Sequence, residues 1–118
     1  MSDRRKRVMP LKDRARAVLA MSLAGYALDV PLSRVEEDGR DSSVAFARQV
    51  AMYLANTALG MSLARIAAAF GRDRSTVAYA CRHIEDMRDN SRFDTWIEAL
   101  ARSATEAPSP FVNIQSAA

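Results

Sequence analysis

Five consecutive polar side chains after Gly71 have the chemistry needed to contact double-stranded DNA: Arg72, Asp73, Arg74, Ser75 and Thr76. A guanidinium group donates paired hydrogen bonds to guanine or phosphate, and a carboxylate accepts a hydrogen bond from the amino group of cytosine. Hydroxyl groups donate to phosphate oxygens, and a threonine methyl group packs on a thymine methyl. Presented together on one helical turn, these side chains could hold the backbone and read bases.

The residues around this cluster have the spacing of a helix-turn-helix. In the stretch SLARIAAAFGRDRSTV, residues 62–77, Ala67 is small enough for a second helix to cross closely over it. Gly71 follows four residues later and can enter the left-handed region that a sharp turn requires. Val77 is placed to pack the second helix onto the first. Such a unit inserts its second helix into the major groove, so the pattern predicts binding to double-stranded DNA.

Charge is unevenly distributed along the 118 residues, although the net charge is only +3. Residues 40–82 hold six arginines and two acidic residues, whereas residues 83–118 hold three arginines and six acidic residues. Arginine outnumbers lysine fifteen to two, which favours bidentate contacts with phosphate or guanine. The basic middle of the chain is therefore the expected footprint for a phosphate backbone.

The sequence lacks the patterns of an enzyme or a metalloprotein. Glycines stand at positions 25, 39, 60 and 71 and none precedes a lysine, which excludes a phosphate-binding P-loop. Cys81 and His83 lie two residues apart, on different sides of a helix, and cannot form a tetrahedral metal site alone. No carboxylate pair or nucleophile–base set stands out. We therefore expect no catalytic activity, no cofactor and no metal.

Cysteine usage indicates the compartment. Cys81 is alone, so no intramolecular disulfide can form, and we expect a cytoplasmic, nucleoid-associated protein. The basic start followed by an apolar run at residues 15–30 has the outline of a signal peptide. Lys12, Asp13, Arg14 and Arg16 crowd the front of that run, however, and argue against secretion. The run is also too short and too rich in alanine to span a membrane.

Apolar periodicity and helix caps predict one small all-helical domain at residues 12–103, between a basic mobile arm at 1–11 and a disordered tail at 104–118. Helices are expected at 12–28, from 42 or 43 to 59, at 63–70, at 74–90 and at 92–103, with a single turn near 32–35. The helix-turn-helix would occupy about residues 62–90. The expected N-caps are Ser42 or Ser43, Ser62 and Asp73.

Two of these helices have a clear apolar face. The second long helix should bury one stripe of residues: Val44, Ala47, Val50, Ala51, Leu54 and Ala58. The last helix should bury Phe93, Trp96, Ile97 and Leu100.

Residues 44–85, VAFARQVAMYLANTALGMSLARIAAAFGRDRSTVAYACRHIE, resemble the C-terminal DNA-binding domain of DnaA, the bacterial replication initiator. The shared pieces, in fixed order, are an ARQ helix, an SLxxIAxAFG helix, an RDxSTV turn and an AxACRxIE continuation. The resemblance implies the small helical fold called DnaA domain IV, which is Trp-repressor-like. The family's ATP-binding motor domain is missing from these residues, so the sequence resembles the short standalone DnaA-related proteins of alphaproteobacteria, the HdaB type.

The resemblance also implies DNA contacts outside the turn. In the family an arginine in the loop before the ARQ helix enters the minor groove, and Arg40 aligns with it. The arginine and glutamine of ARQ grip phosphates, which assigns that role to Arg48 and Gln49.

Contacts implied for the turn and the recognition helix agree with the chemistry of their side chains. Arg72 and Asp73 match the pair that reads bases in the major groove. Ser75 and Thr76 match the residues that touch thymine methyls and the backbone, and Arg82 matches the arginine further along the helix.

Three positions depart from the family pattern. The turn has only Gly71 where the family has two glycines, Arg74 replaces a histidine, and Asn56 replaces a lysine that contacts phosphate. Arg74 adds a permanent charge, while Asn56 removes a phosphate contact. We therefore expect duplex binding with lower discrimination than the initiator shows.

Three functions are compatible with the sequence. The first is a sequence-preferring double-stranded DNA-binding protein that acts as an auxiliary regulator of chromosome replication initiation, at origin-type or DnaA-box-like sites or through regulatory proteins. The second is an adaptor that binds the initiator or its regulators without DNA, which Asn56 and the acidic C-terminal third would suit. The third is a transcription regulator that uses the same DNA face at promoters.

Overall fold

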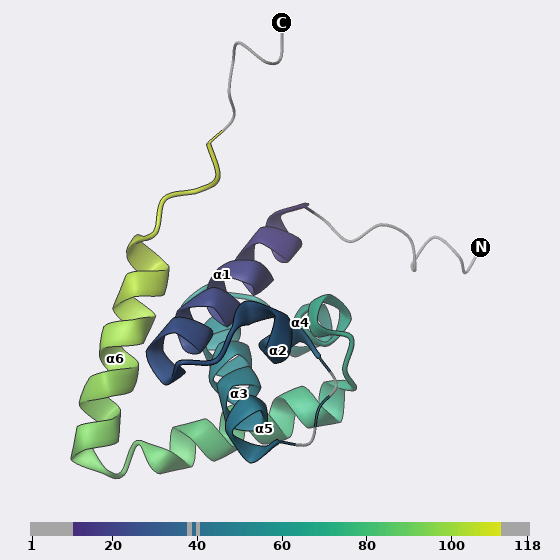
Figure 1. Ribbon diagram of the computed structural model, residues 1–118. Coiled ribbons are helices and arrows are strands. Elements are labelled where there is room, and N and C mark those ends of the chain that lie inside the picture. The colour runs from purple at the N-terminus through teal and green to yellow at the C-terminus, as the bar shows by residue number, and fades with distance from the viewer. Residues whose placement is uncertain (1–10, 38, 40, 112–118) are drawn as a thin grey trace, which may run out of the picture.

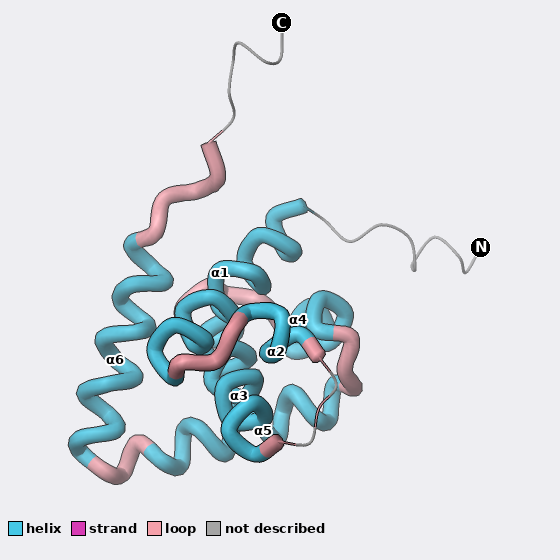
Figure 2. Tube along the Cα trace, in the orientation of Figure 1, coloured by secondary structure: helices cyan, strands magenta, loops and turns pink. Residues whose placement is uncertain are grey.

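The computed structural model describes residues 11–37, 39 and 41–111, and these fold into helices without any strand (Figure 1, Figure 2). In chain order the helices are α1 (Leu11–Leu28), α2 (Leu32–Glu36), α3 (Ser42–Thr57), α4 (Leu63–Phe70), α5 (Arg74–Met87) and α6 (Ser91–Glu106). The all-helical prediction is confirmed. Helix α3 contacts α1 and α5, and α6 extends along one side of the molecule (Figure 1).

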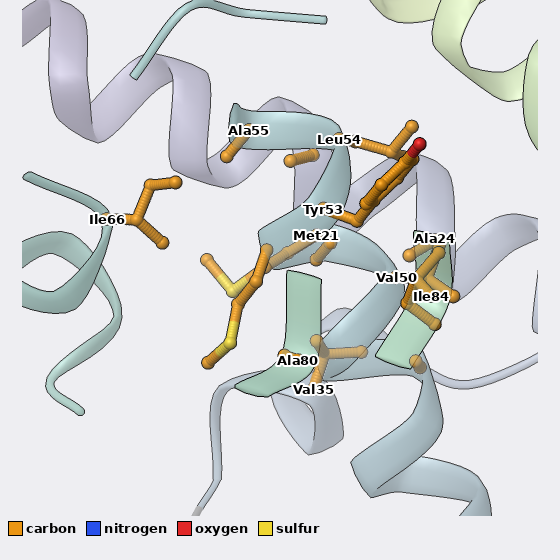
Figure 3. Close-up of a cluster of buried hydrophobic side chains, with 14 of the residues drawn as sticks. Met21, Ala24, Val35, Val50, Tyr53, Leu54, Ala55, Ile66, Ala80 and Ile84 are labelled. Carbon is orange, nitrogen blue, oxygen red and sulfur yellow. The ribbon is translucent and has the colours of Figure 1, made fainter. Parts of the chain in front are cut away.

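Helix α3 supplies the centre of the core because it is buried on almost every side. All but one residue of the predicted stripe are at most 3% exposed: Val44, Ala47, Val50, Ala51 and Leu54. Met52, Tyr53 and Ala55 are equally buried although they lie outside that stripe, since α1 and α5 both pack on the helix. Tyr53 and Ala55 are among the buried side chains drawn in Figure 3. Burial all round is typical of a central helix. Ala58 is only half-buried because it follows the last residue of α3.

The turn after α1 is built on a close backbone approach at Gly25. The Val30 N–H donates to the Gly25 carbonyl at 2.8 Å, and a Cβ atom on Gly25 would lie 2.4 Å from the Val30 oxygen. Only glycine leaves room for this approach. The tight turn returns the chain as the short helix α2, whose Val35 is 1% exposed against the core.

The observed N-cap residue is the predicted one at α4 and a different one at α3. Ser62 caps α4 as expected, because its side chain accepts a hydrogen bond from the Arg65 N–H. The cap of α3 is Asp41, not Ser42 or Ser43: its carboxylate accepts from the Ser43 N–H at 2.9 Å and from the Ser43 hydroxyl at 2.7 Å. These hydrogen bonds hold the pKa of Asp41 below its usual value. Unlike a serine hydroxyl, the Asp41 carboxylate also carries a negative charge, which the positive end of the helix dipole stabilises.

Helix boundaries differ at α5 and α6. The recognition helix ends at Met87, and not near residue 90, because the Asn90 side chain accepts from the Arg92 and Phe93 N–H groups and starts α6. Helix α6 continues to Glu106, and its Ala104 is 1% exposed, so residues 104–106 belong to the domain and not to a tail. The rest of the expected tail is loop at 107–111, and 112–118 lie outside the described residues. Residues 1–10 of the expected arm also lie outside them, while Leu11 is helical.

Helix α6 is attached to the domain by apolar packing and by one arginine. Ile97 and Leu100 are buried as predicted, whereas Phe93 and Trp96 are half-buried and contact each other with ring centroids 5.5 Å apart and planes tilted by 43°. Arg88 follows α5 and donates to Asp94 at 2.5 Å and Glu98 at 2.8 Å, both on α6.

The same arginine joins α6 to α3. Arg88 Nη1 donates to the Tyr53 hydroxyl at 2.9 Å, and that hydroxyl donates to Glu85 at 2.5 Å. Hydrogen bonds to Glu98, Tyr53 and Asp94 raise the pKa of Arg88 further, so the guanidinium stays charged. Asp94 and Glu98 of the acidic C-terminal third are therefore used within the fold.

A second ion pair fixes α1 against the first helix of the helix-turn-helix. The Asp13 side chain is buried on α1, and its carboxylate accepts two hydrogen bonds from the Arg65 guanidinium on α4, one of them at 3.0 Å. Arg16 lies 3.7 Å from the same carboxylate. The Arg65 hydrogen bond is the main reason that the pKa of Asp13 lies below its usual value, against the opposing effect of burial.

Asp13→Asn is expected to lower stability at neutral pH. A depressed carboxyl pKa contributes stability above the unfolded value, near 3.8, and that contribution is lost as pH falls through the lower folded value. The stability difference between wild type and Asp13→Asn should therefore be constant near neutrality and shrink only below about pH 4. Urea unfolding across pH measures it, with exposed Asp89→Asn as the control. Equal stability of wild type and Asp13→Asn at pH 7 would contradict the role of this pair.

Candidate nucleic-acid interface

The helix-turn-helix has the geometry that its spacing predicts. Helix α4 ends at Gly71, which has φ +66° and ψ 38°, the left-handed conformation. A Cβ atom at this position would meet nothing within 4 Å, so the glycine is needed for its backbone angles and not for space. The N–H groups of Gly71 and Arg72 both donate to the Ala67 carbonyl, and Val77 of α5 is fully buried. The turn is therefore tight and α5 is packed firmly onto the core.

The first turn of α5 presents its polar side chains to solvent. Asp73, Arg74, Ser75 and Thr76 are all exposed. Asp73 lies at the N-cap position, but its side chain makes no capping hydrogen bond, and the helix starts from its backbone carbonyl, which accepts from the Thr76 and Val77 N–H groups. Asp73 is thus the N-cap residue, as predicted, but its carboxylate makes no hydrogen bond there and is exposed at the positive end of the helix dipole. An exposed carboxylate at this position accepts hydrogen bonds from a partner, such as the amino group of a base, and repels a phosphate.

The exposed face of α5 continues for two more turns. Arg82 lies seven residues after Ser75, close to the same side of a helix with 3.6 residues per turn, and it is exposed. Tyr79, between them, is 57% exposed and stacks on His83 with ring centroids 5.8 Å apart and planes 6° from parallel. The structure therefore adds an aromatic pair to the exposed face of α5.

Arg48 lies inside the fold and does not project toward solvent. Its side chain is 8% exposed; Nε donates to the Val35 carbonyl at 3.0 Å and Nη2 donates to the Glu37 carbonyl. These carbonyls stand at the end of α2, where helix carbonyls lack partners within the helix. The structure thus places Arg48, which the resemblance assigns to phosphate, against carbonyls at the end of α2. Its neighbour Gln49 is half-buried, and Arg40 lies outside the described residues.

Arg72 also reaches the segment that follows α2. Its Nη2 donates to the Glu37 carbonyl at 3.0 Å, and Nη1 lies 3.4 Å from the Phe70 carbonyl. The Glu37 carbonyl therefore accepts from two arginines, one on α3 and one in the turn of the helix-turn-helix. This bridge connects two parts of the expected interface, and its acceptor is a backbone atom that no residue pattern marks.

Asn56 has a structural role in place of the phosphate contact of the family's lysine. Its side chain donates to the Met61 carbonyl at 2.9 Å across the connection between α3 and α4. Met61 is 1% exposed, so this hydrogen bond holds a buried part of the connection. The hydrogen bond to Met61 thus gives Asn56 a role within the fold at the position where the family has a lysine.

Within residues 11–37, 39 and 41–111 no group of three metal-ligating side chains gathers. None of the helices described is both long enough and apolar enough to cross a membrane.

The fold and the exposed face of α5 define a helix-turn-helix protein, and comparison with known proteins specifies the family. The family described as bacterial dnaA protein helix-turn-helix matches residues 21–84, more than half of the chain. The chain therefore belongs to the bacterial DnaA helix-turn-helix family and holds a DnaA-like DNA-binding domain.

Similar proteins are replication initiators. The chromosomal replication initiator protein DnaA 2 of Chlamydia pneumoniae is 37% identical over 81 residues, which cover 69% of this chain and 18% of that protein. The chromosomal replication initiator protein DnaA of Lactococcus lactis subsp. cremoris is 50% identical over 52 residues, 43% of this chain and 12% of that protein. The chain thus spans about a fifth or less of the length of these relatives.

Solved structures agree with the sequence relatives. A crystal structure of a DNA replication initiation factor superimposes with a TM-score of 0.73 at 28% identity, over 80% of this chain and 30% of that chain. Replication initiator DnaA bound to AMPPCP and single-stranded DNA superimposes with a TM-score of 0.70 at 27% identity, over 80% of this chain and 29% of that chain.

Proposed function

We propose that this protein binds double-stranded DNA with the first turn of α5 in the major groove. The observation that carries the proposal is the exposed row Asp73–Thr76, continued by Arg82, on the second helix of a DnaA-type helix-turn-helix. The core side of α5 is buried at Val77, Ala80 and Ile84, so this row is the side that is open to a partner. Its side chains suit phosphates and base edges.

Each side chain has a role in this proposal. Arg72 and Asp73 read bases, Arg74 and Arg82 contact phosphates, and Ser75 and Thr76 contact the backbone and thymine methyls. Gln49 of α3 and Arg40, which precedes that helix in the sequence, complete the expected footprint. Arg48 acts from inside the fold. Its guanidinium donates hydrogen bonds to the end of α2, and its permanent positive charge lies behind the surface that contacts DNA.

The biological role that fits best is an auxiliary regulator of chromosome replication initiation on the nucleoid. A domain with the family's reading face would occupy DnaA-box-like sites, and two domains of one shape cannot read the same major groove together. Competition with the initiator is then expected at shared sites. Support for an adaptor without DNA binding is weaker, since Asp94 and Glu98 are engaged by Arg88.

Changing the level of the protein in its own host tests this role. Depletion and overproduction should shift the number of replication origins per cell in opposite directions, measured by flow cytometry after replication run-out. Mapping of bound sites across the genome in the same cells should show enrichment at the origin. An unchanged origin count in both directions, with enrichment at promoters, would reject the replication role and favour transcription regulation.

A further inference from the structure

An aromatic pair lies on the exposed side of α5, among the residues that the proposed function assigns to DNA. Tyr79 is 57% exposed, and its ring stacks on His83, four residues later, with centroids 5.8 Å apart and planes 6° from parallel. Aromatic rings in an offset stack, with centroids about 4.5–7 Å apart, attract each other. The tyrosine ring is therefore oriented by its neighbour, although more than half of its surface is open to solvent.

The hydroxyl group of Tyr79 has no hydrogen-bond partner among the residues that the structure describes. By contrast, the hydroxyl group of Tyr53 is engaged within the fold by Glu85 and Arg88. A phenol hydroxyl can both donate and accept a hydrogen bond. The Tyr79 hydroxyl is therefore open to a partner molecule, at the end of a ring that the His83 contact orients.

The position of Tyr79 around α5 indicates which part of a duplex it would face. With 3.6 residues per turn, Ser75 lies about 180° around the helix from the buried Ile84. Tyr79 lies about 140° from Ile84, and His83 about 100°. Ser75 thus marks the middle of the exposed side, and the aromatic pair lies on one flank. In a helix inserted into the major groove, the middle faces base edges and the flanks face the phosphate backbones that form the groove walls.

The neighbours of Tyr79 along the helix are hydrogen-bond donors. Thr76 lies three residues before it and Arg82 three residues after it, and both are exposed. Residues three apart are neighbours on a helix surface. Hydroxyl and guanidinium groups of this kind commonly bind phosphate oxygens, and tyrosine is among the residues that do so. The flank that carries Tyr79 therefore suits a phosphate and not a positively charged partner.

We propose that the Tyr79 hydroxyl donates a hydrogen bond to a backbone phosphate on the wall of the major groove, and that His83 holds the tyrosine ring in place for this contact. The inference rests on the proposed DNA binding and adds two residues to its footprint. Tyr79 makes the contact, whereas His83 is a positioning residue because it acts through the tyrosine ring. The contact adds affinity without counterion release, because the phenol carries no charge.

Tyr79→Phe tests the contact, because it removes the hydroxyl and keeps the stacked ring. We expect binding of the full chain to a fluorescent duplex to weaken about fivefold, the effect of one neutral hydrogen bond. The slope of log affinity against log salt should stay unchanged. Fluorescence anisotropy over a series of salt concentrations measures both quantities. Tyr26→Phe is the matched control and should change neither, because Tyr26 is 87% exposed on α1, outside the proposed interface.

Variants of His83 test the positioning role. His83→Ala removes the stacking partner and should weaken binding about threefold, whereas His83→Phe keeps an aromatic ring and should restore most of the affinity. In the Tyr79→Phe background, His83→Ala should have no further effect, because the hydroxyl through which it acts is gone. Thermal melting of each variant measures the stability of the fold separately.

The possible results separate this inference from the proposed function. Wild-type affinity for Tyr79→Phe, together with a lower salt slope for Arg74→Gln, would overturn the inference and leave the proposed function standing. If neither variant changes affinity or slope, both fail. A lower salt slope for His83→Phe would show that His83 itself contacts phosphate as a cation, and additive losses in the double variant would show that it does not act through Tyr79. Either of these results would overturn the positioning role.

Discussion

Arg48→Ala is expected to lower both the stability of the domain and its affinity for duplex DNA. The variant leaves the Val35 carbonyl without the donor that Arg48 supplies, whereas the Glu37 carbonyl keeps its hydrogen bond from Arg72; an unpaired buried acceptor costs about 1–3 kcal/mol. The loss should appear as a lower urea midpoint with an unchanged m-value. Because the side chain is 8% exposed, most of the effect on DNA should come from the displaced end of α2 and weaken all sequences alike.

Arg48→Lys separates charge from hydrogen bonding in this prediction. The ammonium group keeps the positive charge but is a point donor, and it cannot reproduce the planar fork that serves two carbonyls. We expect it to recover part of the DNA affinity and little of the stability. Wild-type stability for Arg48→Ala would show that the buried guanidinium contributes nothing to the fold.

Arg72→Ala is expected to weaken duplex binding and to relax base preference. A bidentate arginine contributes about 1–3 kcal/mol of discrimination between bases, which is roughly 5-fold to 150-fold in affinity ratio. In the structure Arg72 donates to the Glu37 carbonyl, so its guanidinium is held near the turn before any base is contacted. Selection from a random duplex pool gives the preferred sequence, and the affinity ratio between that sequence and its single-base variants measures discrimination.

Two comparisons make the Arg72 result specific. Arg74→Ala should weaken binding to all sequences by a similar factor, because its expected partner is a phosphate. Arg72→Lys should keep affinity better than discrimination. If Arg72→Ala leaves the ratio between preferred and altered sequences unchanged, Arg72 is a positioning residue for the loop after α2 and reads no base.

Local signals made the helix-turn-helix predictable. The signals are local: Gly71 has the left-handed backbone angles of the turn, and Ser62 caps the helix that it precedes. Val77 is an apolar residue that is buried where α5 packs on the core. The family pattern covers the same residues. Helix ends were less certain because neighbouring caps compete, as Asp41 does with Ser42 and Ser43, and as Asn90 does by starting α6.

Long-range polar contacts could not be read from the sequence. Asp13 and Arg65 are separated by 52 positions, and Arg72 reaches a backbone carbonyl 35 positions away. Arg88 joins three acceptors from two helices. Family alignment assigned Arg48 to phosphate and Asn56 to a lost contact, whereas packing directs both side chains to carbonyls of the chain itself. Such partners depend on how helices pack, which residue types alone do not specify.

The salt dependence of duplex binding shows directly whether the exposed face of α5 contacts DNA. Affinities of wild type and of the double variant Arg74→Ala/Arg82→Ala are measured at several salt concentrations, with single-stranded DNA of the same sequence as competitor. We expect a steep negative slope for wild type and a slope smaller by roughly 1.8 for the double variant, at about 0.9 per phosphate contact. We also expect weak competition by the single strand. Equal slopes for the two proteins would contradict contact between this face and DNA.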